Sequence, residues 1–217
     1  MVREAYHKDL HRLKEEIVIM GNLVGRTIGD AVLSLKNRDV EMAQKVIDID
    51  NEIDALDHSI EENCMRLLAL QQPMARDLRL IISVLKMSID LERMGDLALE
   101  IAVITKMTAN VPPVKPLIDI PRMAEICQQM LADTMSAFEN KDVEVARQVA
   151  RRDDEIDALF DQIRRELISY MIEDPKKITG AQHLTFVARY LERIGDHITN
   201  LCENVVFMVT GERVELN

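Results

Sequence analysis

Acidic residues spaced one helical turn apart are the part of this sequence that could carry chemistry. The segment Leu91–Asp96 reads LERMGD and the segment Leu191–Asp196 reads LERIGD, so the motif is an internal repeat. In each copy the Glu and the Asp are four positions apart, which places both carboxylates on one face of a helix. Two like charges in that arrangement weaken a helix by roughly 0.2–0.5 kcal/mol. The motif therefore favours a function that offsets this repulsion, such as the binding of a cation.

Two more acidic pairs have the same spacing, Asp50 with Asp54 and Asp153 with Asp157. None of these four residues has a Lys or Arg three or four positions away, so a salt bridge along their own helix does not account for them. For the repeated motifs, a solvated face with ordinary salt bridges stays open as the alternative. Three arginines there stand three positions before an acid: Arg93 before Asp96, Arg193 before Asp196, and Arg189 before Glu192.

The first half of the chain is expected to bring four of these acids together across a helix hairpin. In an antiparallel hairpin, residues equidistant from the turn lie side by side, because both helices rise about 1.5 Å per residue. Pro73, which breaks the helical pattern, is equidistant from Asp54 and Glu92 and also from Asp50 and Asp96. We call these four acids the first acidic cluster.

The second half repeats this symmetry about its own break at Asp174–Pro175. That break is equidistant from Asp157 and Glu192 and also from Asp153 and Asp196, and we call these four acids the second acidic cluster. Carboxylates gathered on neighbouring helices repel one another unless some are protonated or a cation lies among them. Oxygen ligands favour hard cations such as Mg, Mn, Ca or iron. The sequence therefore predicts a metal site at each cluster, with room for a multinuclear one, but does not identify the metal.

Helical periodicity dominates the chain, and no alternating strand pattern is present. The first helix is expected over about residues 6–36, and a second, capped by Asp39, runs to the break at Pro73. The others are expected over about residues 74–107, from 119 to 140, from Asp142 to the Asp174–Pro175 break, and from there to about 210. Two copies of three helices predict an all-α fold of two tandem antiparallel three-helix bundles. The first repeat is residues 1–110, a Pro-rich linker is 111–117, and the second repeat is 118–217.

Composition excludes several classes of protein. The 217 residues carry a net charge of −11, which argues against nucleic acid as the main partner because phosphate backbones bind basic faces. The three cysteines have no paired spacing, which favours a reducing compartment and argues against a zinc site. We find no signal-peptide pattern and expect no membrane-spanning stretch. The sequence thus predicts a cytoplasmic protein.

Two alternatives to a metal-binding regulator remain on sequence grounds. A carboxylate di-metal enzyme, oxidase-like, would use two Glu-x-x-His motifs in a bundle core, but this chain has one such motif near its start. No phosphate loop, nucleophile elbow or Cys/His pair is present, so we expect no enzyme. The second alternative is a metal-free helical scaffold whose acidic faces serve solubility.

Two further features concern helix packing. Gly95 and Gly195 interrupt helices at a cost of roughly 1 kcal/mol each relative to alanine, which indicates close approach by a neighbouring helix or a ligand. Apolar residues also share the Glu92 side of their helix and predict a surface for self-association or a partner, unless another helix covers them: Ile81, Leu85, Ile89, Leu99 and Val103.

At these motifs the sequence resembles the PhoU family of phosphate-transport regulators. The likeness covers nearly the whole chain, as two three-helix repeats that each carry D-x-x-x-D on the middle helix and LER[MI]GD on the last. The run Pro73–Arg79 also resembles the family's start of the third helix, whereas the second half lacks the corresponding DLR.

The resemblance implies a cytoplasmic negative regulator of phosphate uptake and of phosphate-starvation signalling. Such proteins are expected to contact the phosphate ABC transporter and a membrane sensor histidine kinase. The resemblance also implies metal clusters, iron among them, on the acidic motifs, and a homodimer.

Overall fold

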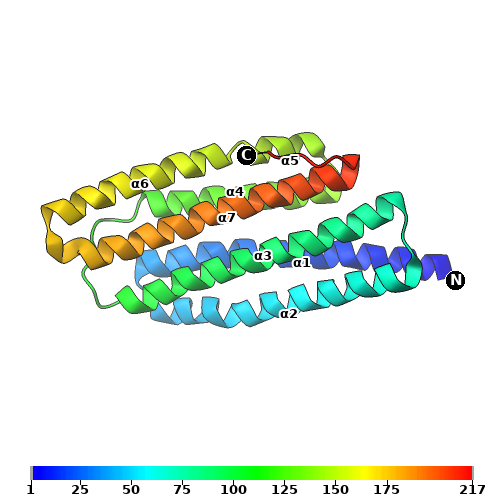
Figure 1. The fold of residues 1–217 in the computed structure, drawn as a ribbon. Helices are drawn as coiled ribbons and strands as arrows, with labels where there is room; N and C mark the ends of the chain where they lie inside the picture. The colour runs from blue at the N-terminus through cyan, green and yellow to red at the C-terminus, as the bar shows by residue number, and fades with distance from the viewer. Residues whose placement is uncertain (1, 217) are drawn as a thin grey trace.

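The computed structural model describes residues 2–216, and the side chains of residues 6–216, as two helical bundles packed together (Figure 1). Over these residues the regular elements are seven α-helices and one short 3-10 helix: α1 Val2–Asn37, α2 Val40–Gln71, α3 Ala75–Thr108, α4 Asp119–Asn140, α5 Val143–Ala150, α6 Asp153–Glu173, η1 Pro175–Lys177 and α7 Ile178–Thr210. Helices α1 to α3 form the first bundle and α4 to α7 the second. The predicted all-α fold of two tandem three-helix bundles is confirmed.

Side-chain caps fix the starts of the middle helices, as the sequence predicts. The carboxylate of Asp39 accepts a hydrogen bond from the backbone N–H of Met42 at 2.9 Å. In the second bundle, Asp142 accepts from the N–H groups of Glu144 and Val145 at 3.1 and 3.0 Å. Each cap satisfies N–H groups that have no partner inside the first turn of a helix. The two bundles thus begin their middle helix with the same device.

The prediction of one continuous middle helix in the second half is wrong, because the chain breaks into α5 and α6. The N–H of Arg152 bonds to the carbonyl of Val149 at 2.9 Å, and the N–H of Glu155 bonds to the carbonyl of Arg152 at 3.0 Å. These three-residue bonds tighten the chain locally, as in a 3-10 turn. The guanidinium of Arg152 also donates to Asp133 of α4 at 3.1 Å. The break places Asp153 in the first turn of α6, where it is 5% exposed.

The bundles meet along two pairs of helices, α3 with α7 and α1 with α4 (Figure 1). Leu10 of α1 and Leu80 of α3 are buried, and the three cysteines are also buried, as packing residues would be. The apolar face predicted on α3 is partly covered and partly open. Ile81 is fully buried there, and Ile89 is exposed. Three other members of the predicted face are half-buried: Leu85, Leu99 and Val103.

Helix α1 is apolar enough over Tyr6–Asn37 to span a membrane by length and composition alone, contrary to the sequence expectation. Half of its most apolar window is buried inside the protein. The buried side chains include Ile17 and Val24, and α1 packs against α2, α3 and α4. A helix at the centre of a helical assembly needs this apolar character on more than one face.

The segment between α3 and α4 crosses from one bundle to the other. Arg38, at the turn between α1 and α2, donates to the carbonyls of Ala109 and Val111 at the start of this segment. Near its other end, the ammonium of Lys115 is buried and pairs with Glu166 of α6 and with Asp119 at 3.6 Å. The linker is therefore anchored to both bundles.

Candidate functional site

The first acidic cluster is assembled from α2 and α3, as the hairpin geometry predicts. Burial raises the pKa of Asp50, and the charges of Asp54 and Asp96 raise it further. The pKa of Glu92 is raised by burial and then by Asp96, with smaller contributions from Asp57 and Asp54 on α2. These carboxylates are thus close enough to oppose one another's ionisation across the two helices.

The second acidic cluster is assembled in the same way from α6 and α7. Burial raises the pKa of Asp157, and Asp196 on the facing helix adds to the effect. For Glu192, burial again comes first, followed by the charges of Asp196 and Asp157, both of which raise its pKa. Asp153 lies beside Gly195, next to Asp196 in the chain. All four predicted members therefore lie along the α6–α7 contact.

The two clusters differ in how deep one of their acids lies. Asp153 is buried, and its charge raises the pKa of the Cys127 and Cys202 thiols behind it. The corresponding acid of the first cluster, Asp50, is only half-buried. Asp153 is the first residue of α6, directly after the break from α5, whereas Asp50 lies inside the continuous helix α2. The internal repeat is therefore not preserved at this position.

Arginines neutralise part of each cluster, so the salt-bridge alternative holds for some of the acids. Arg93 pairs with Asp96 at 3.1 Å and with Glu92 at 3.4 Å, and it is 58% exposed. Arg189 pairs with one carboxylate oxygen of Glu192. Exposed pairs of this kind contribute about 0–1 kcal/mol. They leave a net excess of negative charge in both clusters.

Asp57 is a member of the first site that the sequence reasoning missed. It is half-buried on α2, one of its oxygens has no hydrogen-bond partner among the described residues, and its charge raises the pKa of Glu92. The sequence does indicate this position, because Asp57 follows Asp54 by three residues and so lies on the same face of the helix. The second repeat has Phe160 at the matching position, so Asp57 does not belong to the acidic pattern that the two repeats share.

The residues fit a hard cation by their charge and by their donor atoms. Among the described side chains no three acidic, His or Cys groups stand in an arrangement that would hold a metal as they lie. One oxygen of Glu192 is nevertheless buried without a hydrogen bond, and the absence of a side chain at Gly195 lets the Asp153 carboxylate pack closely against α7. Carboxylate oxygens alone are a donor set for Mg, Mn, Ca or iron. Binding would require rotation of side chains that now avoid one another.

The repulsion within the first cluster has a consequence for stability in metal-free protein. Because the pKa of Asp50 is raised in the folded state, its stabilising contribution is complete below its unfolded pKa and is lost as pH rises through the folded pKa. Asp50→Asn is therefore expected to raise the free energy of unfolding at pH 7 by about 0.5 kcal/mol. The gain should shrink in acid, where Asp50 is protonated. Urea denaturation at both pH values measures it.

The exposed acid Glu52 on the same helix provides the control for this prediction. Glu52→Gln is expected to leave the unfolding free energy unchanged at either pH. A loss of stability in Asp50→Asn at pH 7 would contradict the repulsion.

Comparison with known proteins places this architecture in one family. The family model described as the PhoU domain matches residues 17–105 and 120–205, one match for each bundle. A relative from Aquifex aeolicus, named phosphate-specific transport system accessory protein PhoU homolog, is 42% identical over 208 residues, covering 96% of this chain and 94% of the relative. A relative of the same name from Clostridium acetobutylicum is 36% identical over 218 residues, covering 100% of both chains.

Solved structures agree with the sequence comparisons. The crystal structure of PhoU from Pseudomonas aeruginosa superposes with a TM-score of 0.92 at 36% identity, over 95% of this chain and 100% of that one. The structure of the phosphate transport system regulatory protein PhoU from Streptococcus pneumoniae gives a TM-score of 0.88 at 33% identity, over 96% and 99%. Family model, relatives and structures coincide over both bundles, and this chain belongs to the PhoU family.

Proposed function

We propose that this chain is an accessory regulator of a phosphate transport system. The observation that carries the proposal is the match of the PhoU domain to both bundles, together with full-length relatives named as accessory proteins of phosphate-specific transport. In more detail, the protein acts in the cytoplasm as a homodimer. It represses phosphate uptake and starvation signalling through contacts with the phosphate ABC transporter and a sensor histidine kinase. It performs no catalysis of its own.

The proposed regulator holds hard metal ions, iron, Mn or Mg, at its two acidic clusters, in mononuclear or multinuclear form. Support comes from the mutual rise of pKa among carboxylates on facing helices and from the oxygen-only donor set. Bound cations would remove the repulsion and tie α2 to α3 and α6 to α7. Bound metals would then set how tightly each hairpin is closed.

Metal analysis of the purified protein tests this part of the proposal. The wild type is expected to carry stoichiometric metal, and the pair Asp54→Asn with Glu92→Gln should lose the metal of the first cluster, because two of its ligands no longer carry charge. The second cluster should keep its metal in that variant. Glu62→Gln, which changes an exposed acid on α2 outside the clusters, should retain full metal content.

A reporter of phosphate starvation in the native host tests the regulatory part separately. Deletion of the gene should activate the reporter in phosphate-rich medium, and wild-type protein or Glu62→Gln should restore repression. If the cluster variant represses as well as wild type, metal at the first cluster is not needed for regulation. If the wild-type gene fails to restore repression, the regulatory assignment itself is wrong.

A further inference from the structure

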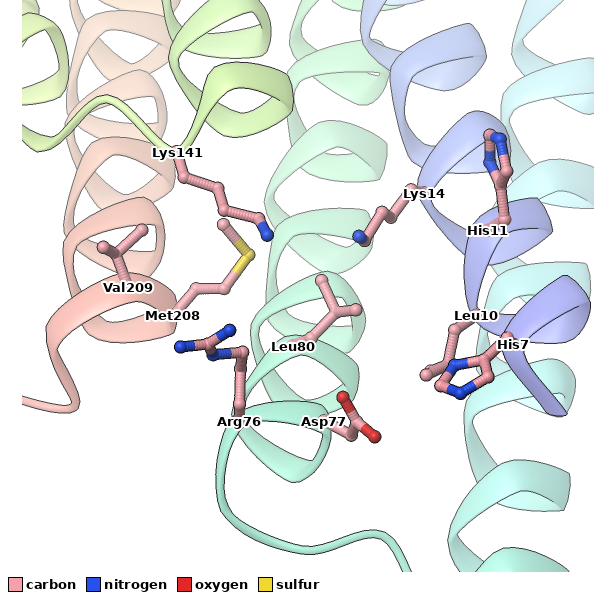
Figure 2. A pocket seen from close by; sticks show the side chains of 10 residues that line it. All are labelled: His7, Leu10, His11, Lys14, Arg76, Asp77, Leu80, Lys141, Met208 and Val209. Atoms are coloured by element: carbon pink, nitrogen blue, oxygen red, sulfur yellow. The ribbon is translucent and has the colours of Figure 1, made fainter. Parts of the chain in front are cut away.

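A pocket of about 480 Å³ opens between the two bundles, away from both acidic clusters. It lies where the start of α1, the start of α3, the turn between α4 and α5, and the end of α7 come together (Figure 2). Small-molecule sites in proteins typically occupy roughly 300–1,000 Å³ and lie between packed units. The pocket therefore has the size and position of a ligand site.

The lining of this pocket is cationic in a chain whose net charge is −11. Lys14 comes from α1, Arg76 from α3, and Lys141 from the turn that follows α4. Figure 2 shows the ammonium groups of Lys14 and Lys141 pointing toward each other across the opening, with Arg76 on the same side as Lys141. Asp77 is the acid that lines the pocket, and it accepts a hydrogen bond from the hydroxyl of Tyr6 at 3.1 Å.

These three cations have no salt bridge or side-chain hydrogen bond to occupy them within residues 6–216. Burial lowers the pKa of Lys14 from its ordinary value, the charge of Lys141 lowers it further, and Asp77 acts in the opposite direction. Like charges brought together disfavour the ionised state of each, and here Asp77 offsets only part of that effect on Lys14. The proximity of Lys14 and Lys141 is thus electrostatically unfavourable by itself, as it would be in a site built for an anion.

The internal repeat supplies a comparison at the opposite end of the molecule. There a second space is lined by counterparts, in the internal repeat, of three pocket residues. Arg38 corresponds to Lys141, Gly180 to Leu80 and Thr108 to Met208. The linker fills it and leaves a volume of only about 60 Å³. We call this the linker end, and the end with the pocket the open end.

The two basic turn residues have different tasks at the two ends. Arg38 and Lys141 both adopt a left-handed conformation, with φ of 58°. The guanidinium of Arg38 is used to hold the linker carbonyls. Lys141 has no such acceptor within residues 6–216, and its side chain extends into the pocket instead.

We propose that the open-end pocket binds a soluble small-molecule anion carrying two or more phosphoryl groups, held by Lys14, Lys141 and Arg76. Lysine is a point-charge ligand for phosphate, and arginine contacts phosphate through two parallel N–H groups. Three cations call for a ligand with several negative charges, and the volume exceeds what one orthophosphate would fill. Leu10, Leu80 and the end of α7 supply apolar walls for the rest of the molecule. Such a ligand would connect the two bundles.

Isothermal titration of the full chain with tripolyphosphate tests this proposal, after bound metal has been removed with a chelator and the protein dialysed into metal-free buffer of fixed ionic strength. Without metal, the anion cannot bind through cations at the acidic clusters, so the result is independent of the proposed metal sites. The double variant Lys14→Gln/Lys141→Gln is expected to weaken binding at least about tenfold, because two charged contacts are lost. Lys86→Gln, an exposed lysine on α3 outside the pocket, should change affinity less than about twofold.

The other probes define the ligand class. Orthophosphate is expected to bind at least about tenfold more weakly than tripolyphosphate, and citrate, which carries carboxylates in place of phosphoryl groups, should also bind more weakly. If citrate bound as tightly as tripolyphosphate, the preference for phosphoryl groups would be wrong. If orthophosphate bound as tightly, the need for several phosphoryl groups would be wrong. No saturable binding of tripolyphosphate, or equal binding by the double variant, would overturn it altogether.

Thermal melts show that the variants fold and give a second readout. Tripolyphosphate should raise the melting temperature of the wild type and leave that of the double variant unchanged. Without ligand, the double variant should melt at or above the wild-type temperature, since it removes the repulsion between Lys14 and Lys141. A marked drop in its melting temperature would show that these lysines stabilise the fold and would argue against the site.

Discussion

Gly195→Val is expected to lower the free energy of unfolding by about 3 kcal/mol, because the new side chain overpacks the contact between α6 and α7. A Cβ at this position would overlap the carboxylate of Asp153 and lie 3.0 Å from Cδ1 of Ile156. Asp153 is 5% exposed and so has little room to move aside. Guanidinium denaturation followed by circular dichroism measures the change.

Replacement of Gly25 and of Gly195 by alanine, in separate variants, provides the matched control. A Cβ on Gly25 would meet Cδ2 of Leu131 at 3.5 Å, an ordinary contact, so Gly25→Ala should stabilise the protein by about 0.5–1 kcal/mol through helix propensity. Gly195→Ala should lower stability despite the same gain in propensity. If both substitutions stabilise the protein equally, the close approach of Asp153 to α7 is not a constraint.

Lys115→Met is expected to lower the free energy of unfolding by about 2 kcal/mol. The Lys115 side chain is 6% exposed and its ammonium pairs with Glu166 and Asp119, so its removal leaves two carboxylates without their counter-charge. Breaking a fully buried ion pair costs roughly 3–5 kcal/mol, and the smaller value here follows from the partial exposure of both acids, 37% and 20%. Urea denaturation of the full chain is the measurement.

Two comparisons separate the ion pair from general effects. The double variant Lys115→Met/Glu166→Gln should recover part of the loss, because one of the stranded charges is removed. Lys176→Met, at an exposed lysine in η1, should change stability by less than about 0.5 kcal/mol. No recovery in the double variant would mean that Lys115 acts through packing of its alkyl chain.

Local rules were sufficient to predict most of the fold from the sequence. Asp39 and Asp142 cap helices where expected, and the position of Pro73 fixes which residues of α2 and α3 face each other. The first acidic cluster follows from that register and the second from the break at Asp174–Pro175, since equal rise per residue pairs positions at equal distance from a turn. The clusters could therefore be derived without knowing how the bundles pack.

Features that depend on contacts between distant segments could not be predicted in this way. The break at Arg151–Arg152 contains neither Gly nor Pro, and the guanidinium of Arg152 bonds to Asp133 on another helix there. Ile81 is fully buried although the pattern of α3 alone presents it as surface, and its carbonyl lies 3.7 Å from the Cys64 sulfur of α2. The cationic pocket draws Lys14 and Lys141 from separate bundles, so no spacing in the sequence links them.

The two ends of the molecule differ chemically because a single linker joins two similar bundles. A pair of separate identical bundles would show the same face at top and bottom. Here the linker seals the space between the bundles at one extremity, and the other stays accessible and positively charged. A protein that binds along the length of the two bundles can thus distinguish one end from the other, even though the acidic motifs along the sides are repeated.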